Sequence, residues 1–413
     1  MIKNDDVSFE GGKSNLPDGW KWVKLGDVCQ TTSGGTPSRA VPSYYGGDIP
    51  WVKSGDLNDG LIYETEESIT QEAITNSSAK KFPAGTLLVA MYGATVGKLG
   101  ILAIEAATNQ AVCGIFCDEL LIDRNYLFYY IRQQRKKLIE SSFGGAQPNI
   151  SQDIIRAVKI LLPSLDEQKR IAGILNEKME AVEKARESAI AQLEAAKALT
   201  AAYLRSVFNS PEAQTWEIKT LEEVCESSQY GTSEASNDQD DGLPVLRMGN
   251  ISEGRIIWQN LKYINLSETE KNKYKLKKGD ILFNRTNSAE LVGKTAVFDG
   301  SHDAVFASYL IRFRVVPGLV SPDYIALFIN SLWGRKFIES KMTRAIGQVN
   351  ISASTMQKMP IPIPAFSRQQ DIVSKLTEKL TEVEKLCKAL EEQLETINKL
   401  PAAFLRQAFN GEL

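Results

Sequence analysis

Apolar side chains recur every seventh position in two stretches of the chain, one after residue 164 and one after residue 367. A seven-residue apolar repeat is typical of a coiled-coil seam, so we expect two long helices that pack against each other. The expected seam residues are Leu175, Val182, Ala189, Ala196, Leu376, Val383, Leu390 and Ile397. The alternative is that each helix packs independently on its own domain.

The starts and ends of these helices carry their own signals. Ser164 with Glu167, and Ser367 with Gln370, fit capping boxes in which two side chains satisfy free backbone donors at a helix start. Pro401 is expected to kink or end the second helix, because proline lacks the backbone N–H that the helix needs. The tail that follows it then needs a partner surface.

Shorter apolar and β-branched runs, bounded by Gly, Pro, Asn and Asp, fill the regions that precede the two helices. Such runs predict strands. The expected strands include 86–91, 101–104, 280–283 and 310–316, and the expected helices are 125–141 and 322–341. The glycine-rich stretch from Gly93 to Lys98 is one residue short of a phosphate-binding loop and lacks its hydroxyl, so we expect it to close a hairpin.

The chain repeats itself with a period of roughly two hundred residues, which is the size of a domain. Trp20, Leu25 and Val28 recur as Trp216, Leu221 and Val224. The other recurring residues are Gly97 and Lys98 with Gly293 and Lys294, Gln147 and Asn149 with Gln348 and Asn350, and Leu204 and Phe208 with Leu405 and Phe409. Since Gln147 and Gln348 recur while their surroundings vary, we expect them to hold each domain ending against its helix.

These patterns together predict an α+β protein. We expect two mixed α/β domains at opposite ends of a two-helix antiparallel coiled coil, related by a pseudo-two-fold internal repeat. The expected boundaries are an N-terminal arm at 1–19, a first domain at 20–163, a first helix at 164–210, a second domain at 211–364, and a second helix with a tail at 365–413.

Composition narrows the chemistry. The five cysteines are scattered and odd in number, and there is one histidine, so neither a disulfide framework nor a zinc site is expected, although Cys113 and Cys117 form a CxxxC pair. No apolar run is long enough to cross a bilayer and no signal-peptide pattern opens the chain, so we expect a cytoplasmic protein. The net charge of −3 means that any DNA-binding surface must be local.

Several motifs, taken in order, resemble the DNA-specificity subunits of type I restriction–modification enzymes. The resemblance covers nearly the whole chain. It is carried by the domain openings at 16–28 and 216–224, the stretches 35–39, 44–57, 279–288 and 291–294, the domain endings at 147–151 and 348–352, and the helix starts at Glu167–Gln168 and Arg368–Gln369. Each motif is weak alone, and their shared order is specific.

That resemblance implies two target-recognition domains that each bind half of a bipartite, asymmetric site on double-stranded DNA. It also implies that the helices set the spacing and dock two methyltransferase subunits, and that restriction–translocase subunits join the complex. The chain itself would then be no enzyme and would hold no cofactor, since S-adenosylmethionine, ATP and magnesium belong to those partners. Weak, salt-sensitive DNA binding is expected of the chain alone, and strong specific binding with its partner.

Base recognition requires side chains that donate or accept two hydrogen bonds near loop tips. The candidates in the first domain are Arg39, Tyr44, Tyr45, Lys53, Ser54, Tyr92 and Thr95. Those in the second are Arg247, Asn250, Asn284, Arg285, Thr286, Asn287, Lys294 and Arg344, where the run 284–288 could equally be a structural turn. There are two competing hypotheses: the chain is a structural adapter that never touches nucleic acid, or it is an enzyme.

Overall fold

The computed structural model describes residues 19–141, 149–239, 241–345 and 348–413. The chain forms two compact units: unit 1 comprises Met1–Ser188 with Leu394–Leu413, and unit 2 comprises Ala189–Gln393. Gln147 and nearly all of the expected N-terminal arm lie outside the described residues. Among the described helices, none combines the length and apolar character that a membrane crossing requires.

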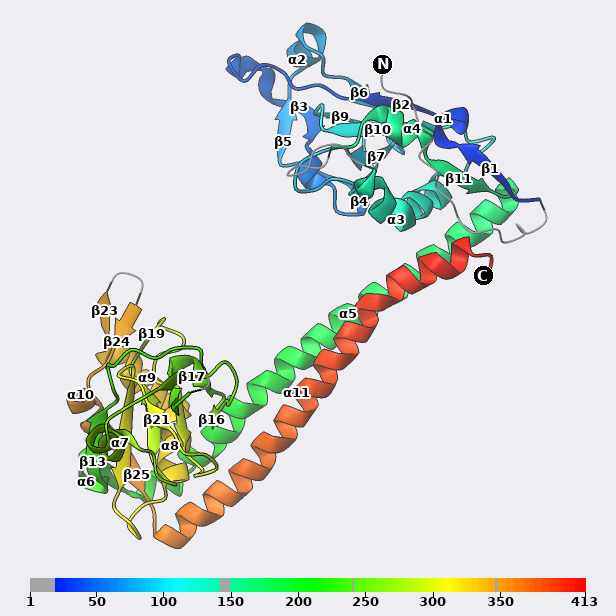
Figure 1. The fold of residues 1–413 in the computed structure, drawn as a ribbon. Coiled ribbons are helices and arrows are strands. Elements are labelled where there is room, and N and C mark those ends of the chain that lie inside the picture. Colours follow the sequence, from blue (N-terminus) through cyan, green and yellow to red (C-terminus); the bar gives the residue numbers. More distant parts are fainter. Residues whose placement is uncertain (1–18, 142–148, 240, 346–347) are drawn as a thin grey trace. The chain divides into compact units, whose positions relative to one another are not determined.

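Figure 1 shows the chain as a ribbon, with its elements labelled where there is room. Up to the end of the first long helix they are β1 Lys21–Lys24, α1 Leu25–Val28, β2 Cys29–Ser33, η1 Pro42–Tyr44, β3 Tyr45–Val52, η2 Ser54–Asp56, β4 Gly60–Ile62, β5 Glu67–Ile69, α2 Gln71–Asn76, β6 Lys81–Phe82, β7 Leu87–Ala90, β8 Leu99–Leu102, β9 Ala106–Thr108, β10 Val112–Cys117, α3 Arg124–Glu140, α4 Gln152–Ala157, β11 Lys159–Leu162 and α5 Leu165–Phe208.

After α5 the elements are η3 Ala213–Thr215, β12 Glu217–Thr220, α6 Leu221–Val224, β13 Cys225–Tyr230, β14 Leu243–Leu246, η4 Met248–Asn250, β15 Ile251–Ser252, β16 Arg255–Ile256, β17 Lys262–Ile264, α7 Glu268–Tyr274, β18 Ile281–Asn284, β19 Thr286–Asn287, β20 Thr295–Val297, β21 Val305–Phe306, β22 Leu310–Val315, α8 Pro322–Asn330, α9 Leu332–Lys341, β23 Thr343–Ala345, β24 Gln348–Asn350, α10 Ala353–Gln357, β25 Pro360–Ile363 and α11 Phe366–Phe409.

The sheets repeat between the units. Unit 1 has a sheet of order β2-β10-β7-β8-β4 and a second of order β5-β3-β9-β6. Unit 2 has the matching orders β13-β22-β18-β20 and β17-β14-β21. The central strands β7 and β18 are buried along their whole length, which explains their continuous apolar runs. The predicted mixed α/β composition of each half is therefore confirmed.

Backbone hydrogen bonds show how closely the two frames agree. In unit 1 the N–H of Gly97 donates to the C=O of Ala90, and in unit 2 the N–H of Gly293 donates to the C=O of Asn284. An arginine from the following helix clamps each turn: Arg135 donates to the Gly97 carbonyl and Arg335 to the Val292 carbonyl. The stretch before Lys98 thus closes the hairpin between β7 and β8, as predicted.

Each long helix contains 44 residues and contributes to both units. In unit 1 the start of α5, at Leu175, shares a core with the end of α11, at Phe409. In unit 2 the end of α5, at Phe208, shares a core with the start of α11, at Leu376. The helices therefore run antiparallel in each unit. The eight expected seam residues are all buried: Leu175, Val182, Ala189, Ala196, Leu376, Val383, Leu390 and Ile397.

Three predictions about helix ends were wrong. Helix α11 begins at Phe366, so Ser367 is its second residue and not its cap. It also does not end at Pro401 but continues to Phe409. The tail has the partner surface that was expected, because Phe409 is buried in the unit 1 core and contacts two tyrosine rings. The helix expected at 322–341 is divided at Ser331, whose hydroxyl donates to the Phe328 carbonyl and ends α8.

A fully buried glutamine ties each unit to its long helix. Gln168 accepts from the Asp123 N–H at 2.8 Å and donates to the carbonyls of Leu121 and Pro163. Gln369 repeats these bonds with the Ser321 N–H, at 2.8 Å, and with the carbonyls of Leu319 and Pro364. The prediction gave this role to Gln147 and Gln348, but Gln348 is an exposed residue of β24.

Candidate nucleic-acid interface

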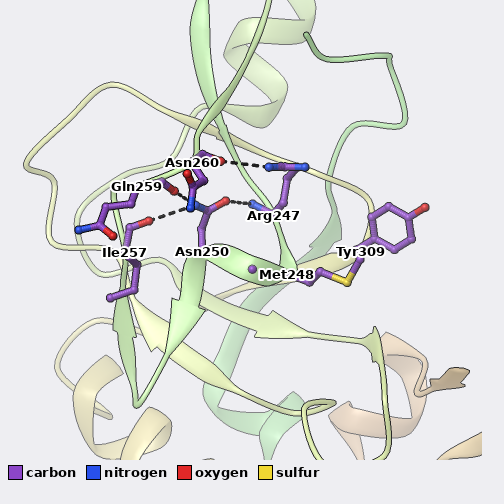
Figure 2. Close-up of a pocket in the computed structure, with 8 residues that line it drawn as sticks. Arg247, Met248, Asn250, Ile257, Gln259, Asn260 and Tyr309 are labelled. Atoms are coloured by element: carbon purple, nitrogen blue, oxygen red, sulfur yellow. Dashed lines mark hydrogen bonds between the residues drawn. The ribbon is translucent and has the colours of Figure 1, made fainter. Parts of the chain in front are cut away.

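Unit 2 contains a pocket of about 390 Å³ between η4, the segment that follows β16, and the start of β22 (Figure 2). It is lined by Arg247, Met248, Gly249, Asn250, Ile257, Gln259, Asn260 and Tyr309. We call these residues the unit 2 pocket. Its lining combines a guanidinium, three amide side chains and an exposed tyrosine ring, which are groups that hydrogen-bond to or stack on nucleobases.

The Asn250 side chain holds the backbone around this pocket. Its side chain is buried, accepts from the Arg247 N–H at 3.0 Å, and donates to the carbonyls of Ile257 and Gln259 at 3.1 and 3.0 Å (Figure 2). Both amide hydrogens are therefore used inside the unit. Asn250 is best placed to hold the loop that presents Arg247.

The Arg247 guanidinium stands at the rim of the pocket. It donates to the Asn260 carbonyl at 3.1 Å, and its Nε has no hydrogen-bond partner. Among the described residues no carboxylate forms an ion pair with it. Part of its hydrogen-bonding capacity is thus free for a ligand.

A second group of polar side chains lies at the end of strand β18. Asn284 donates to the Met248 carbonyl at 3.4 Å, and its Oδ1 is buried without a partner. Arg285 donates to the Asn350 Oδ1 at 2.9 Å, lies 4.7 Å from the centre of the Tyr230 ring, and leaves its Nε unpaired. Asn350 in turn donates to the Thr286 Oγ1 at 2.9 Å.

Buried polar atoms normally have partners, so their absence calls for an explanation. Three such unpaired atoms lie in this part of unit 2: Arg247 Nε, Asn284 Oδ1 and Arg285 Nε. The structure thus brings Arg247, Asn284, Arg285 and Thr286 into one connected region.

The other predicted residues of unit 2 lie on neighbouring elements. Asn287 pairs with Val349 in the small sheet of β19, β24 and β23, and Arg344 is exposed on β23 of the same sheet. Lys294 belongs to the turn before β20, where its carbonyl accepts from the Asn284 N–H at 2.9 Å. These three residues flank the central group. Among the described residues, no side-chain hydrogen bond joins them to it.

In unit 1 the cationic candidates face carboxylates of their own chain. Arg39 pairs with Glu67 at 2.7 Å, and Lys53 pairs with Glu66 and Glu67 at 2.6 and 2.9 Å. The hydrogen bond from Lys53 and the guanidinium of Arg39 lower the pKa of Glu67. The Arg39 guanidinium also lies 4.2 Å from the centre of the Tyr45 ring.

The remaining candidates of unit 1 differ in how free they are. The Tyr45 hydroxyl donates to the Pro37 carbonyl at 2.5 Å, while Tyr44 and Ser54 are half-buried beside the charged group in η1 and η2. Tyr92 and Thr95 lie at the turn after β7, where Tyr92 bridges to Asn149 and burial raises its pKa. The structure therefore groups Arg39, Tyr45 and Lys53, and places Tyr92 and Thr95 on a separate turn.

The backbone hydrogen bonds of the two units match, so some candidates occupy the same backbone position, or slot, in both units. The Lys53 N–H donates to Asp56 as the Arg247 N–H donates to Asn250, and each residue opens a 3-10 turn. The Met91 N–H donates to the Ala111 carbonyl as the Arg285 N–H donates to the Tyr309 carbonyl. Residues Ala90, Met91 and Tyr92 thus correspond to Asn284, Arg285 and Thr286.

Sequence reasoning missed the groups that orient these side chains. Glu66 and Glu67 pair with the cations of unit 1, while Tyr230 and Tyr309 lie beside Arg285 and the pocket of unit 2. Tyr230 is far from Arg285 in sequence, and no motif links the two. The pair of adjacent glutamates was visible, but nothing in the sequence placed it beside Lys53.

In the described part of the chain no three His, Cys, Asp or Glu residues gather as a ligand group, at the CxxxC pair or elsewhere. Cys113 is a buried thiol of β10, and burial raises its pKa to about 12. This agrees with the expectation of a buried thiol in a strand.

Two copies of one α/β frame, each with its own set of polar side chains and both joined to the same antiparallel helices, define a duplicated recognition protein. The family model of the type I restriction modification DNA specificity domain matches twice, at residues 17–192 and 213–396. The chain therefore belongs to the family of type I restriction–modification specificity subunits. The double match also confirms the internal repeat, and this membership confirms that the chain is a specificity subunit and not an enzyme.

Similar proteins bear the same description. The chain is 26% identical to the type I restriction enzyme EcoKI specificity subunit of Escherichia coli K12, over 96% of this chain and 90% of that protein. It is 24% identical to the StySPI specificity subunit of Salmonella potsdam, over 97% and 90%.

Solved structures share the fold. A chain from a structure of type I R-M complex assembly matches with a TM-score of 0.78 and 22% identity, over 97% of this chain and 100% of that one. The HsdS subunit from Thermoanaerobacter tengcongensis matches with a TM-score of 0.62 and 22% identity, over 97% and 99%.

Proposed function

We propose that this protein binds double-stranded DNA sequence-specifically, and that each unit reads one half of a bipartite, asymmetric target. The observation that carries the proposal is a common backbone frame with different side chains in corresponding slots. A frame of this kind presents both units to DNA in the same way, while the exchanged side chains select different bases.

The slot of Arg285 provides the clearest contrast. In unit 1 it holds Met91, a buried apolar residue, whereas in unit 2 it holds a guanidinium steered by Asn350 and Tyr230. Arginine is suited to the two acceptors on the major-groove edge of guanine. Arg285 is therefore our candidate for base recognition in unit 2, with Arg247, Asn284 and Thr286 beside it.

The slot of Lys53 and Arg247 is basic in both units, which suits contact with phosphate or with guanine. In unit 1 the remaining candidates are Arg39, Tyr44, Tyr45, Ser54, Tyr92 and Thr95. In unit 2 they are Asn250, which we assign to holding the loop, and Asn287, Lys294 and Arg344, which are suited to the flanking backbone.

The partners follow from family membership. We propose that α5 and α11 set the distance between half-sites and dock two methyltransferase subunits, and that restriction–translocase subunits join the complex. S-adenosylmethionine, ATP and magnesium would bind to those subunits. The net charge of −3 supports a shared grip on DNA, because partners would supply part of the phosphate neutralisation that this chain lacks.

We test this proposal by replacing Arg285 with the residue that unit 1 has in the same slot. Arg285→Met carries the residue that unit 1 has at the same backbone position, so it removes the guanidinium with little change in bulk. With partner methyltransferase subunits present, we expect binding to the half-site read by unit 2 to fall about 10- to 100-fold, as the loss of one bidentate base contact predicts. Binding to DNA that carries only the other half-site should stay unchanged.

Arg344→Met is the matched control, since it removes an exposed arginine of the same unit. It should weaken binding to all sequences to a similar and smaller degree, as expected of a phosphate contact. Equal losses at both half-sites for Arg285→Met, with a folded unit 2, would mean that Arg285 is structural. Mapping of methylated sites in cells that carry the variant gives the same answer independently.

A further inference from the structure

Two cysteines of unit 1 face each other across neighbouring strands. Cys29 of β2 is directly opposite Cys117 of β10. The adjacent residues Val28 and Asp118 form a hydrogen-bonded pair, in which the Asp118 N–H donates to the Val28 carbonyl at 3.2 Å. Because hydrogen-bonded and non-hydrogen-bonded pairs alternate, Cys29 and Cys117 occupy a non-hydrogen-bonded pair, where Cα atoms are about 4.5 Å apart and side chains are closest. Disulfides span Cα distances of about 4.4–6.8 Å, so a bond needs no large backbone movement.

The surroundings of the two thiols differ. Cys29 is buried, and its hydrogen bond with Cys117, together with burial, raises its pKa. Cys117 is half-buried, and the hydrogen bond from Cys29 and the positive charge of Arg124 lower its pKa. The Nε of Arg124 is buried without a hydrogen-bond partner. Cys117 is therefore the more acidic of the two thiols, and the thiolate is the reactive form of a cysteine.

Unit 2 lacks both features in the same slots. Cys225 corresponds to Cys29, but the residue opposite is Val315, again in a non-hydrogen-bonded pair, since the Val316 N–H donates to the Val224 carbonyl at 3.0 Å. Asp123 and Ser321 are the caps of the corresponding helices α3 and α8, so Arg124 corresponds to Pro322. Burial raises the pKa of Cys225 to about 12. The second thiol and the activating cation thus occur together in unit 1 and are both replaced in unit 2.

We propose that Cys29 and Cys117 form a site of reversible oxidation, at which a peroxide converts the two thiols to a cross-strand disulfide. The Cys117 thiolate attacks one oxygen of hydrogen peroxide, the O–O bond breaks, and the departing hydroxide takes a proton to become water. This leaves a sulfenic acid on Cys117. The Cys29 sulfur then loses its proton and attacks the Cys117 sulfur, the S–O bond breaks, and a second water leaves. Two thiols and one peroxide give one disulfide and two waters, and a dithiol reductant reverses the change.

The bond would form at the base of a segment that docks on the long helix. After Cys117 the chain passes to Leu121 and Asp123, whose backbone groups are held by Gln168 of α5. A disulfide there fixes the ends of β2 and β10 and thereby restrains this segment. We therefore expect amide hydrogen exchange in β2, β10 and residues 118–123 to slow on oxidation, while exchange in β13 and β22 of unit 2 stays unchanged. This expectation does not depend on the proposed function.

The experiment treats the full-length protein with hydrogen peroxide and measures intact mass and proteolytic peptides. We expect a loss of two hydrogens and a linked peptide that contains Cys29 and Cys117, both reversed by dithiothreitol. Cys117→Val gives unit 1 the valine that unit 2 has in the same slot, and it should abolish the link while hydrogen exchange shows a folded unit. Arg124→Met should slow the linkage about tenfold, since it lowers the thiolate fraction.

Val315→Cys is the reciprocal variant, because it places a second thiol opposite Cys225 without the nearby arginine. It should link more slowly than the native pair of unit 1 in the same molecule. Three results would overturn the proposal: no linked peptide in the native protein, accumulation of sulfinic acid on Cys117 in place of the link, or oxidation of buried Cys113 at the same rate. An unchanged rate in Arg124→Met would overturn the role of the cation.

Discussion

Lys53 of unit 1 and Arg247 of unit 2 occupy the same backbone slot, yet their charges are treated differently. Lys53 is held by Glu66 and Glu67, whereas Arg247 donates to the Asn260 carbonyl and keeps its Nε unpaired. Carbonyl groups orient a cation without cancelling its charge, while carboxylates cancel it. The frame therefore decides where a cation stands, and neighbouring loops decide how much of its charge is available to a ligand.

A second pair of corresponding positions lies inside the sheets. Thr86 precedes β7 in unit 1, and Asp280 precedes β18 in unit 2. The Thr86 hydroxyl donates to the carbonyl three residues earlier, and the Asp280 carboxylate accepts from the N–H three residues earlier. Asp280 also pairs with Arg314 at 2.6 Å and lies 3.8 Å from buried Arg312. Unit 2 thus contains a buried ionic cluster at a position where unit 1 has a single hydroxyl.

The largest expected effect comes from breaking that cluster. Asp280→Ala leaves the Arg312 guanidinium buried without its carboxylate, and removing one partner of a buried pair costs about 3–5 kcal/mol. Thr86→Ala in the corresponding slot removes one neutral hydrogen bond and should cost about 1 kcal/mol. Denaturant unfolding, followed by hydrogen exchange in each unit, measures both. If the two variants lose similar stability, the cluster contributes no more than the hydroxyl does.

The two buried glutamines, Gln168 and Gln369, allow a test of a feature that both units share. Gln168→Met and Gln369→Met keep the size of the side chain but leave one backbone N–H and two carbonyls without their partner, at a cost of about 2–3 kcal/mol each. Because the bonds match between the units, we expect equal losses, measured as shifts of the unfolding midpoint. Gln348→Met, at an exposed position of β24, is the control and should be nearly neutral. A loss confined to one glutamine would show that the frames are not energetically equivalent.

The repeat and the seam could be predicted because both are periodic in the sequence. Leu175 and Leu376 are marked by regular spacing, and buried strands such as β7 by runs of apolar residues, so local patterns were enough. The end of α11 was not local: it depends on Phe409 reaching aromatic rings of unit 1, which outweighs the hydrogen bond lost at Pro401. The break at Ser331 is local, since its hydroxyl donates to the Phe328 carbonyl and caps α9, but a serine within an apolar helical pattern does not by itself predict a break.

The candidate site was predicted less completely than the fold. Arg285 and its neighbours were found because polar side chains follow a buried strand directly. Tyr230 and Asn350, which orient Arg285, come from other strands and meet it only through sheet topology. The same holds for Glu66 and Glu67 beside Lys53. A side chain's type and position were visible in the sequence, and its partners were not.

The smallest expected effect concerns the carboxylates that hold Lys53. The Lys53 hydrogen bond, and then Arg39, lower the pKa of Glu67, so this group stabilises the folded state above its ordinary pKa, and the contribution is lost as pH falls through the lowered value. The pair is partly exposed, so we expect Glu67→Gln to cost less than about 1 kcal/mol at neutral pH. The difference from the native protein should vanish in acid, below the ordinary carboxyl range. Glu64→Gln is the control, because it removes the same charge from an exposed residue of the same loop. If unit 1 contacts DNA through Lys53, Glu67→Gln should also strengthen DNA binding relative to Glu64→Gln, since it removes one of the two carboxylates that pair with the ammonium group. Equal binding by the two variants would mean that the carboxylates of unit 1 do not restrain its cations, and that the contrast with Arg247 has no consequence for binding.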